Sequence, residues 1–144
     1  MVKALVLYHS QQYGNTEKMA KAVAEGLEGC EVSLHNTNVQ RYPIDEYGTF
    51  DVVALGSPDY FSYMAGTLKT FLDDWYLHRN QPRYKGKPYV LFMSHGGGGR
   101  AKESMNIFHY LGTQVGNIVI SSGSPNEAVL KQCRELGELL AKSV

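Results

Sequence analysis

Few cysteines and no excess of either charge set the first limits on this sequence. Cys30 and Cys133 are far apart in the 144 residues and form no CxxC pair. Two such cysteines do not make a disulfide framework, and they predict reduced, buried thiols in a cytoplasmic protein. Lys and Arg number 14, Asp and Glu also number 14, and the net charge is zero. We therefore expect neither nucleic-acid binding through a basic field nor attachment to an anionic membrane surface.

Long hydrophobic runs are also absent. No apolar run approaches the roughly 18 residues that span a bilayer, so no membrane insertion is expected. The apolar start of the chain is too short for a signal peptide and lacks a cleavage site. The histidines outside the loops, His35, His78 and His109, show no metal-ligand spacing, and no metal is expected. The length suits one domain of roughly 150 residues, without repeats or a linker, so residues 1–144 are expected to form a single domain.

What the chain does contain is a regular alternation of apolar runs, glycine-bearing turns and helical patterns. The apolar runs predict five strands, at residues 2–8, 31–35, 51–55, 88–93 and 115–120. The helical spacing of apolar residues predicts four helices, at 16–27, 66–77, 101–111 and 126–142. Residues 36–50 are the least regular, with a short helix as one option. Such alternation requires right-handed crossovers and a doubly wound α/β fold, in which helices cover both faces of a parallel sheet.

Three unusual loops follow three of the expected strands. They comprise residues 9–15, 56–65 and 94–99. In a parallel sheet the carboxyl ends of neighbouring strands lie at one edge, where ligands bind near a topological switch point. We therefore expect the three loops to converge on one ligand site.

The first loop has the composition of a phosphate site. Helix N-termini offer free N–H groups and a partial positive charge, so they hold phosphate without Lys or Arg. Gly14 allows the backbone to approach the phosphate closely. Hydroxyl and amide groups come from Ser10, Thr16, Gln12 and Asn15. The alternative is an ordinary helix cap at Asn15 or Thr16. No Lys precedes Thr16, and no GxGxxG occurs, which disfavours nucleotide hydrolysis and a Rossmann site.

The second and third loops suit a flat ligand. Tyr60, Phe61 and Tyr63 follow a strand outside any hydrophobic periodicity and could flank a ring. Core packing by Phe61 and exposure of the two tyrosines is the alternative. The four glycines 96–99 present bare backbone that can lie against a ring edge and hydrogen-bond to it. A mobile loop without a ligand is the alternative there.

These motifs resemble those of the flavodoxin superfamily. Residues 8–20, YHSQQYGNTEKMA, resemble its phosphate loop, where Ser-x-Thr-Gly-Asn-Thr-Glu is common. Residues 56–75, GSPDYFSYMAGTLKTFLDDW, are similar to the flavin-ring loop and following helix of NAD(P)H:quinone oxidoreductases of the tryptophan-repressor-binding-protein type, and residues 87–99 resemble their third loop. The likeness covers nearly the whole chain. It implies a flavodoxin-like five-stranded parallel sheet of order 2-1-3-4-5, with FMN as the cofactor.

The resemblance also implies a role for each loop residue. The FMN phosphate would be wrapped by Ser10, Gln12, Tyr13, Gly14, Asn15 and Thr16. The flavin ring would be lined by Pro58, Asp59, Tyr60, Phe61, Ser62 and Tyr63, with backbone N–H groups near its N5 and O4. The O2 and N3 side would meet Ser94, His95, Gly96, Gly97 and Gly98. The first loop is one residue longer than usual, which leaves open whether Gln11 or Gln12 points at the phosphate.

Three functions remain open at this point. The first is an enzyme in which FMN takes a hydride from NADH or NADPH and gives two electrons to a quinone or similar acceptor. The second is a flavodoxin, a one-electron carrier between redox partner proteins. The third is a non-redox FMN-binding module. The chain lacks the insertion of the tetrameric quinone reductases, so their tetramer is not expected, and a homodimer stays open.

Several features favour the enzyme. Carriers are usually strongly acidic, whereas this chain has no net charge. Carriers commonly place an aromatic residue in the third loop, which here has only glycines. No glycine lies between Ser57 and Ala65, so a peptide flip beside the flavin would cost more here. Against the enzyme, the length is that of a carrier, and the sequence shows no nicotinamide pocket.

Three loop residues have two interpretations each. His9 and His95 could meet at one edge and help to move a proton, or they could be loop residues hydrogen-bonded to the backbone. Arg100 could contact a pyridine-nucleotide phosphate, or it could be an ordinary surface charge at a helix start.

Overall fold

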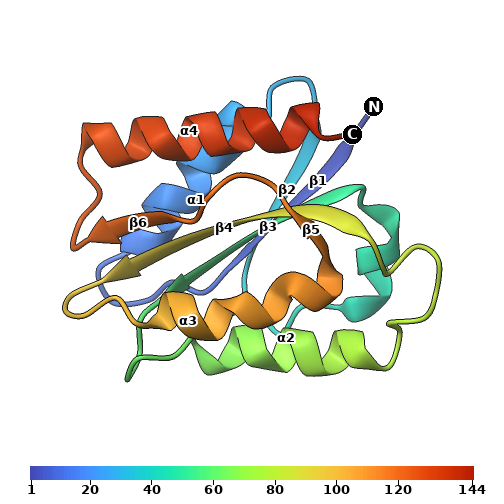
Figure 1. The fold of residues 1–144 in the computed structure, drawn as a ribbon, viewed down its shortest axis with the longest axis horizontal. Coiled ribbons are helices and arrows are strands. Elements are labelled where there is room, and N and C mark those ends of the chain that lie inside the picture. The colour runs from blue at the N-terminus through green and yellow to red at the C-terminus, as the bar shows by residue number, and fades with distance from the viewer.

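A parallel β-sheet forms the centre of the protein, and helices cover both of its faces (Figure 1). The computed structural model describes residues 1–144. The strands in chain order are β1 (Lys3–Tyr8), β2 (Glu31–Asn36), β3 (Val52–Pro58), β4 (Lys87–His95), β5 (Gly112–Gln114) and β6 (Val119–Ser122). They pair in the order β2-β1-β3-β4-β5, all parallel, and β6 also pairs with β4. The predicted flavodoxin-like α/β fold and its 2-1-3-4-5 order are therefore confirmed.

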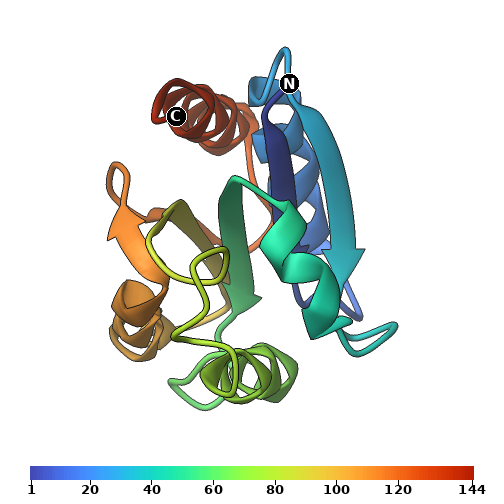
Figure 2. The same ribbon diagram turned by 90° about the vertical axis from the view of Figure 1, so that its right-hand side faces the viewer.

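The helices divide between the two faces of the sheet, as the end-on view in Figure 2 shows. One face carries α1 (Asn15–Gly26) and α4 (Glu127–Lys142), which pack beside each other. The other face carries α2 (Gly66–Tyr76), α3 (Ala101–Met105) and the 3-10 helices η1 (Ile44–Thr49) and η2 (Asn106–Leu111). None of these helices is long and apolar enough to cross a membrane.

A separate hydrophobic core lies on each side of the sheet. The core under α2 and α3 holds 20 buried residues, and the core under α1 and α4 holds 16. The stripe predicted on α2 is buried in the first core, since Leu68, Phe71 and Trp75 are at most 5% exposed. Cys133 is fully buried in the second core, where desolvation raises its thiol pKa to about 12, so it packs as a neutral residue.

Two predicted elements near the β5 edge of the sheet differ from the structure. The expected strand at 115–120 is instead two short strands, β5 and β6, that pair with opposite halves of β4. Gly116 lies between them with a φ of 67°, a left-handed conformation outside the extended region of a regular strand. The expected helix at 101–111 is α-helical only to Met105 and continues as η2.

Candidate functional site

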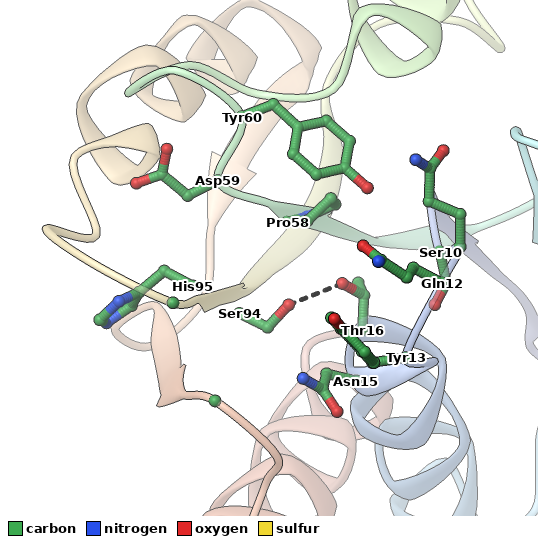
Figure 3. A pocket seen from close by; sticks show the side chains of 13 residues that line it. Ser10, Gln12, Tyr13, Asn15, Thr16, Pro58, Asp59, Tyr60, Ser94 and His95 are labelled. Atoms are coloured by element: carbon green, nitrogen blue, oxygen red, sulfur yellow. Dashed lines mark hydrogen bonds between the residues drawn. The ribbon is translucent and has the colours of Figure 1, made fainter.

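The carboxyl ends of β1, β3 and β4 meet at one edge of the sheet, where the three loops enclose a cavity of about 320 Å³ (Figure 3). The cavity is lined by Ser10, Gln11, Gln12, Tyr13, Asn15, Thr16, Pro58, Asp59, Tyr60, Ser94, His95, Gly96 and Gly123. The structure thus brings the three loops together, as expected from the parallel topology.

Some of the predicted site residues lie outside the cavity wall. They are Gly14, Phe61, Ser62, Tyr63, Gly97 and Gly98. Gly14 lies just before α1, where its left-handed φ of 70° turns the first loop into the helix. Phe61 is fully exposed at the tip of its loop, which excludes core packing for this residue. Contact between FMN and any of the predicted residues stays a prediction.

The cavity also contains residues that the sequence did not assign. Gln11 and Gln12 both line it, and which of them points at the phosphate stays open. Gly123 lies just after β6, and its N–H donates to the carbonyl of His95 at 2.6 Å. Gly123 was not found from the sequence because the last strand was expected to end at Ile120, whereas β6 ends at Ser122. A small residue directly after a strand at the same edge was the signal that could have found it.

The first loop presents a set of free N–H donors. Gly14 is the N-cap of α1 and has no side chain to cap it, so the alternative of an ordinary cap at Asn15 or Thr16 is wrong. The Ser10 amide donates to Asn36, and the Ser10 hydroxyl accepts from the amide of Glu17. Five backbone N–H groups have no protein partner, those of Gln11, Gln12, Tyr13, Asn15 and Thr16. Free N–H groups at a helix N-terminus are the donors that a phosphate requires.

A buried hydrogen bond forms the floor of the cavity. The hydroxyls of Thr16 and Ser94 lie 2.8 Å apart, drawn as the dashed line in Figure 3. Both side chains are at most 5% exposed. The bond joins the first turn of α1 to the end of β4, so it holds the first and third loops at a constant separation.

The second loop closes as a tight two-residue turn. Tyr60 and Tyr63 exchange both backbone hydrogen bonds, at 3.0 and 3.1 Å. Between them, Phe61 and Ser62 have φ values of 57° and 65°. The carboxylate of Asp59 accepts from the amide of Ser62 at 2.8 Å and from that of Ala101 at 3.3 Å. The Tyr60 ring stands in the cavity wall (Figure 3).

The third loop wraps around His95. The amide of Gly97 donates to the Nδ1 atom of His95 at 3.2 Å, and Gly99 has a φ of 67° directly against the ring. The amides of Gly96 and Gly98 have no protein partner and could meet a ring edge. Arg100 is exposed and pairs with Glu103 at 3.7 Å, as an ordinary surface charge does.

The two loop histidines do not share a contact. His95 lines the cavity, whereas His9 lies behind it. His9 hydrogen-bonds to the side chains of Thr67 and Gln11 rather than to backbone groups. A joint proton-moving pair is therefore not formed in this structure.

The cavity fits the phosphate and the flat ring of FMN. The first loop offers free backbone amides to the phosphate, and the second and third loops offer an aromatic wall and bare backbone to the ring.

Among solved structures, an archaeal flavodoxin is 24% identical, with a TM-score of 0.83, over 98% of this chain and 97% of that chain. A WrbA-like flavodoxin from Agrobacterium tumefaciens is 21% identical, with a TM-score of 0.83, over 99% and 96%. The flavodiiron protein from Giardia intestinalis is 25% identical, with a TM-score of 0.82, over 97% and 35%.

The family described as Flavodoxin matches residues 6–131 of this chain. The match begins inside β1, includes all three loops and ends within α4. It therefore covers the whole cavity as well as most of the fold. The chain belongs to the flavodoxin family of FMN-binding redox flavoproteins.

Proposed function

We propose that this protein is an NAD(P)H-dependent oxidoreductase that transfers two electrons to a quinone or similar acceptor. Bound FMN supplies the hydride and electron chemistry, and the protein supplies binding and orientation. The reaction balances as NAD(P)H, a proton and a quinone converted to NAD(P)⁺ and a hydroquinone. The observation that carries this proposal is the geometry of the turn at Phe61 and Ser62, which lie just outside the cavity wall and directly follow Tyr60, a residue of that wall.

The turn holds its central peptide in one orientation. Two central residues with positive φ, closed by a reciprocal backbone pair, form a type I′ turn. Reversing the peptide between them would produce a type II′ turn, which demands glycine at the first central position. Phe61 occupies that position, so its Cβ opposes the reversal. Besides the Tyr60–Tyr63 pair and the Cβ of Phe61, Asp59 restrains the turn, because its carboxylate accepts from the amide of Ser62 at 2.8 Å.

A fixed peptide favours two-electron chemistry. A peptide that reorients can offer the flavin a different hydrogen-bonding group in each oxidation state, which separates the two one-electron potentials. A one-electron carrier needs that separation, because about 59 mV is a tenfold change in the equilibrium constant of a one-electron couple. A two-electron enzyme gains nothing from it. The zero net charge and the third loop, which has four glycines and no Phe, Tyr or Trp, support the same function.

The second candidate function is a one-electron carrier that serves a redox partner protein. The observation in its favour is that an archaeal flavodoxin and this chain match over nearly their whole lengths. The two functions differ in their reaction with pyridine nucleotides and in the spacing of their potentials.

Anaerobic titration and potentiometry test the proposal. NADH or NADPH should bleach the flavin of the wild-type protein, and a soluble quinone should restore its absorbance. The two one-electron midpoint potentials should lie close together. Phe61→Gly should move them apart by removing the Cβ that opposes peptide reversal. Ser62→Gly is the matched control, since it relieves the second left-handed position and leaves Phe61 in place, so the spacing should not change.

Widely separated potentials in the wild-type protein, with no bleaching by either nucleotide over hours, would identify a one-electron carrier instead.

A further inference from the structure

His9 is a buried histidine that contacts the cavity wall from behind. It directly follows β1 and is 5% exposed. Its Nε2 atom lies 2.9 Å from Oε1 of Gln11, and its ring packs edge-on against Tyr60 with centroids 5.6 Å apart. Gln11 and Tyr60 both line the cavity. A change at His9 can therefore reach the cavity through these two side chains.

A chain of hydrogen bonds leads from the other side of the ring into the protein. The Nδ1 atom of His9 lies 2.7 Å from the hydroxyl of Thr67, which lies 2.7 Å from the hydroxyl of Thr37. The Thr37 hydroxyl donates to the carbonyl of Tyr8 at 3.1 Å. Each hydroxyl has one proton to donate. Thr37 uses its proton on Tyr8, so Thr67 must donate to Thr37, and His9 Nδ1 must donate to Thr67.

The proton on the other ring nitrogen of His9, which faces the cavity wall, follows from the same donor and acceptor roles. The Oε1 atom of Gln11 can only accept, so Nε2 of His9 must donate to it. The complete set of bonds thus requires a proton on both ring nitrogens, which is the charged imidazolium. A neutral ring keeps the chain only if the Thr37 hydroxyl leaves the Tyr8 carbonyl or if the Gln11 amide turns round. In the second case, the carbonyl oxygen and the NH₂ group of Gln11, a residue that lines the cavity, exchange places.

We propose that His9 is a positioning residue whose protonation is coupled to the binding of an anion in the cavity. The charged ring holds Gln11 with its NH₂ group free for the ligand and adds positive charge behind a loop that has no Lys or Arg from His9 to Thr16. This inference rests on the flavin phosphate binding at the first loop and does not depend on the electron acceptor.

The surroundings of His9 make it responsive to such an anion. Burial lowers the pKa of His9 below its ordinary value, and the hydrogen bond with Gln11 partly opposes this. The titratable side chain facing the ring is the phenol of Tyr60, while Thr67 on α2, Thr37 after β2 and Gln11 are neutral. No carboxylate or cationic side chain pairs with the ring. A dianionic phosphate nearby would therefore be the dominant charge acting on His9, and its binding should be accompanied by proton uptake.

Calorimetry of FMN and riboflavin binding between pH 5.5 and 8 tests the proposal, in buffers of different ionisation enthalpy. His9→Asn should weaken FMN binding several-fold near pH 6 and hardly at all near pH 8. The proton uptake at neutral pH should fall. Riboflavin, which lacks the phosphate, should show neither effect. His109→Asn, in an exposed part of η2, is the control and should behave as wild type. Comparison of variants removes the contribution of the phosphate's own titration.

A second variant protects the test against misfolding. Gln11→Met removes the amide from an exposed residue, and the imidazole pKa of His9, followed by NMR, should then rise less on FMN addition than in the wild-type protein. An affinity ratio of wild type to His9→Asn that is constant with pH would overturn the proposal, as would an equal loss of riboflavin affinity. Failure of the wild-type protein to bind either flavin would instead overturn the flavin site itself, and this inference with it.

Discussion

At the scale of single residues, two buried phenol groups have no hydrogen-bond partner. The hydroxyls of Tyr42 and Tyr47 lie in the core under α2, and Tyr47 is fully buried. Burial raises the pKa of the Tyr47 phenol well above its ordinary value, so the group stays neutral. An unsatisfied buried hydroxyl loses its hydrogen bonds to water without compensation, and this destabilises the folded state.

Tyr47→Phe should therefore stabilise the protein by about 1 kcal/mol, the typical size of such an effect. Urea unfolding measures the change. Tyr84→Phe is the matched control, because the Tyr84 hydroxyl lies 3.1 Å from the carbonyl oxygens of Ile44 and Asp45. Removing that hydroxyl should lower the free energy of unfolding. A loss of stability in both variants would mean that Tyr47 has a partner in solution.

At the scale of elements, α1 and α4 cross in close contact at two glycines. A Cβ atom at Gly26 would collide with the carbonyl of Arg134, and one at Gly137 would collide with the carbonyl of Val23. Glycine inside a helix costs up to about 1 kcal/mol relative to alanine, so local propensity does not explain Gly137. Close approach of the two helix backbones does explain it.

Gly137→Ala should consequently destabilise the protein, by about 1–3 kcal/mol, because overpacking outweighs the gain in helix propensity. Thermal or urea unfolding gives the sign directly. Gln132→Ala, at an exposed position of the same helix, should leave stability nearly unchanged. If Gly137→Ala raised the midpoint of unfolding, the helices would not be in backbone contact.

At the scale of the whole molecule, a buried lysine links stability to pH. Lys87, at the start of β4, is 5% exposed and donates to the carbonyl of Phe50 at 2.6 Å. Burial, with a contribution from Arg83, lowers its pKa to about 8, while Asp51 opposes the shift. In the unfolded chain the pKa is about 10.4. Between these values the unfolded state binds more protons, so the free energy of unfolding rises with pH.

We expect the titration of Lys87 to contribute a rise in the free energy of unfolding, measured with urea, between about pH 8 and 9.5, within the window between those two pKa values. Lys87→Met should flatten this rise, because it removes the titrating group. Lys85→Met, at an exposed neighbouring position, should preserve it. The buried thiol of Cys133, whose pKa is also raised, opposes this contribution from about pH 8.5, and the buried tyrosines add to the opposition above pH 10, since raised pKa values make ionisation favour unfolding. A slope that is the same in both variants would contradict a buried, charged Lys87.

The sequence by itself determined the architecture and the place of the site. Apolar runs separated by helical patterns favour a doubly wound parallel sheet, because strands that are apolar on both faces need cover on both faces. The strand order of this sheet was implied by the family resemblance. Loops after neighbouring parallel strands must meet at one edge, which is why the cavity holds residues from each of the three predicted loops. These features depend on local pattern and on rules that every such sheet obeys.

Only the tertiary structure decided the contacts between distant residues. The break between β5 and β6 depends on a left-handed Gly116 and on which half of β4 each strand meets. The network of His9 joins residues 28 and 58 positions away in the chain. Such partners are set by the path of the whole backbone, and no local periodicity encodes them. The orientation of each cavity side chain, including Gln11, depends on those partners.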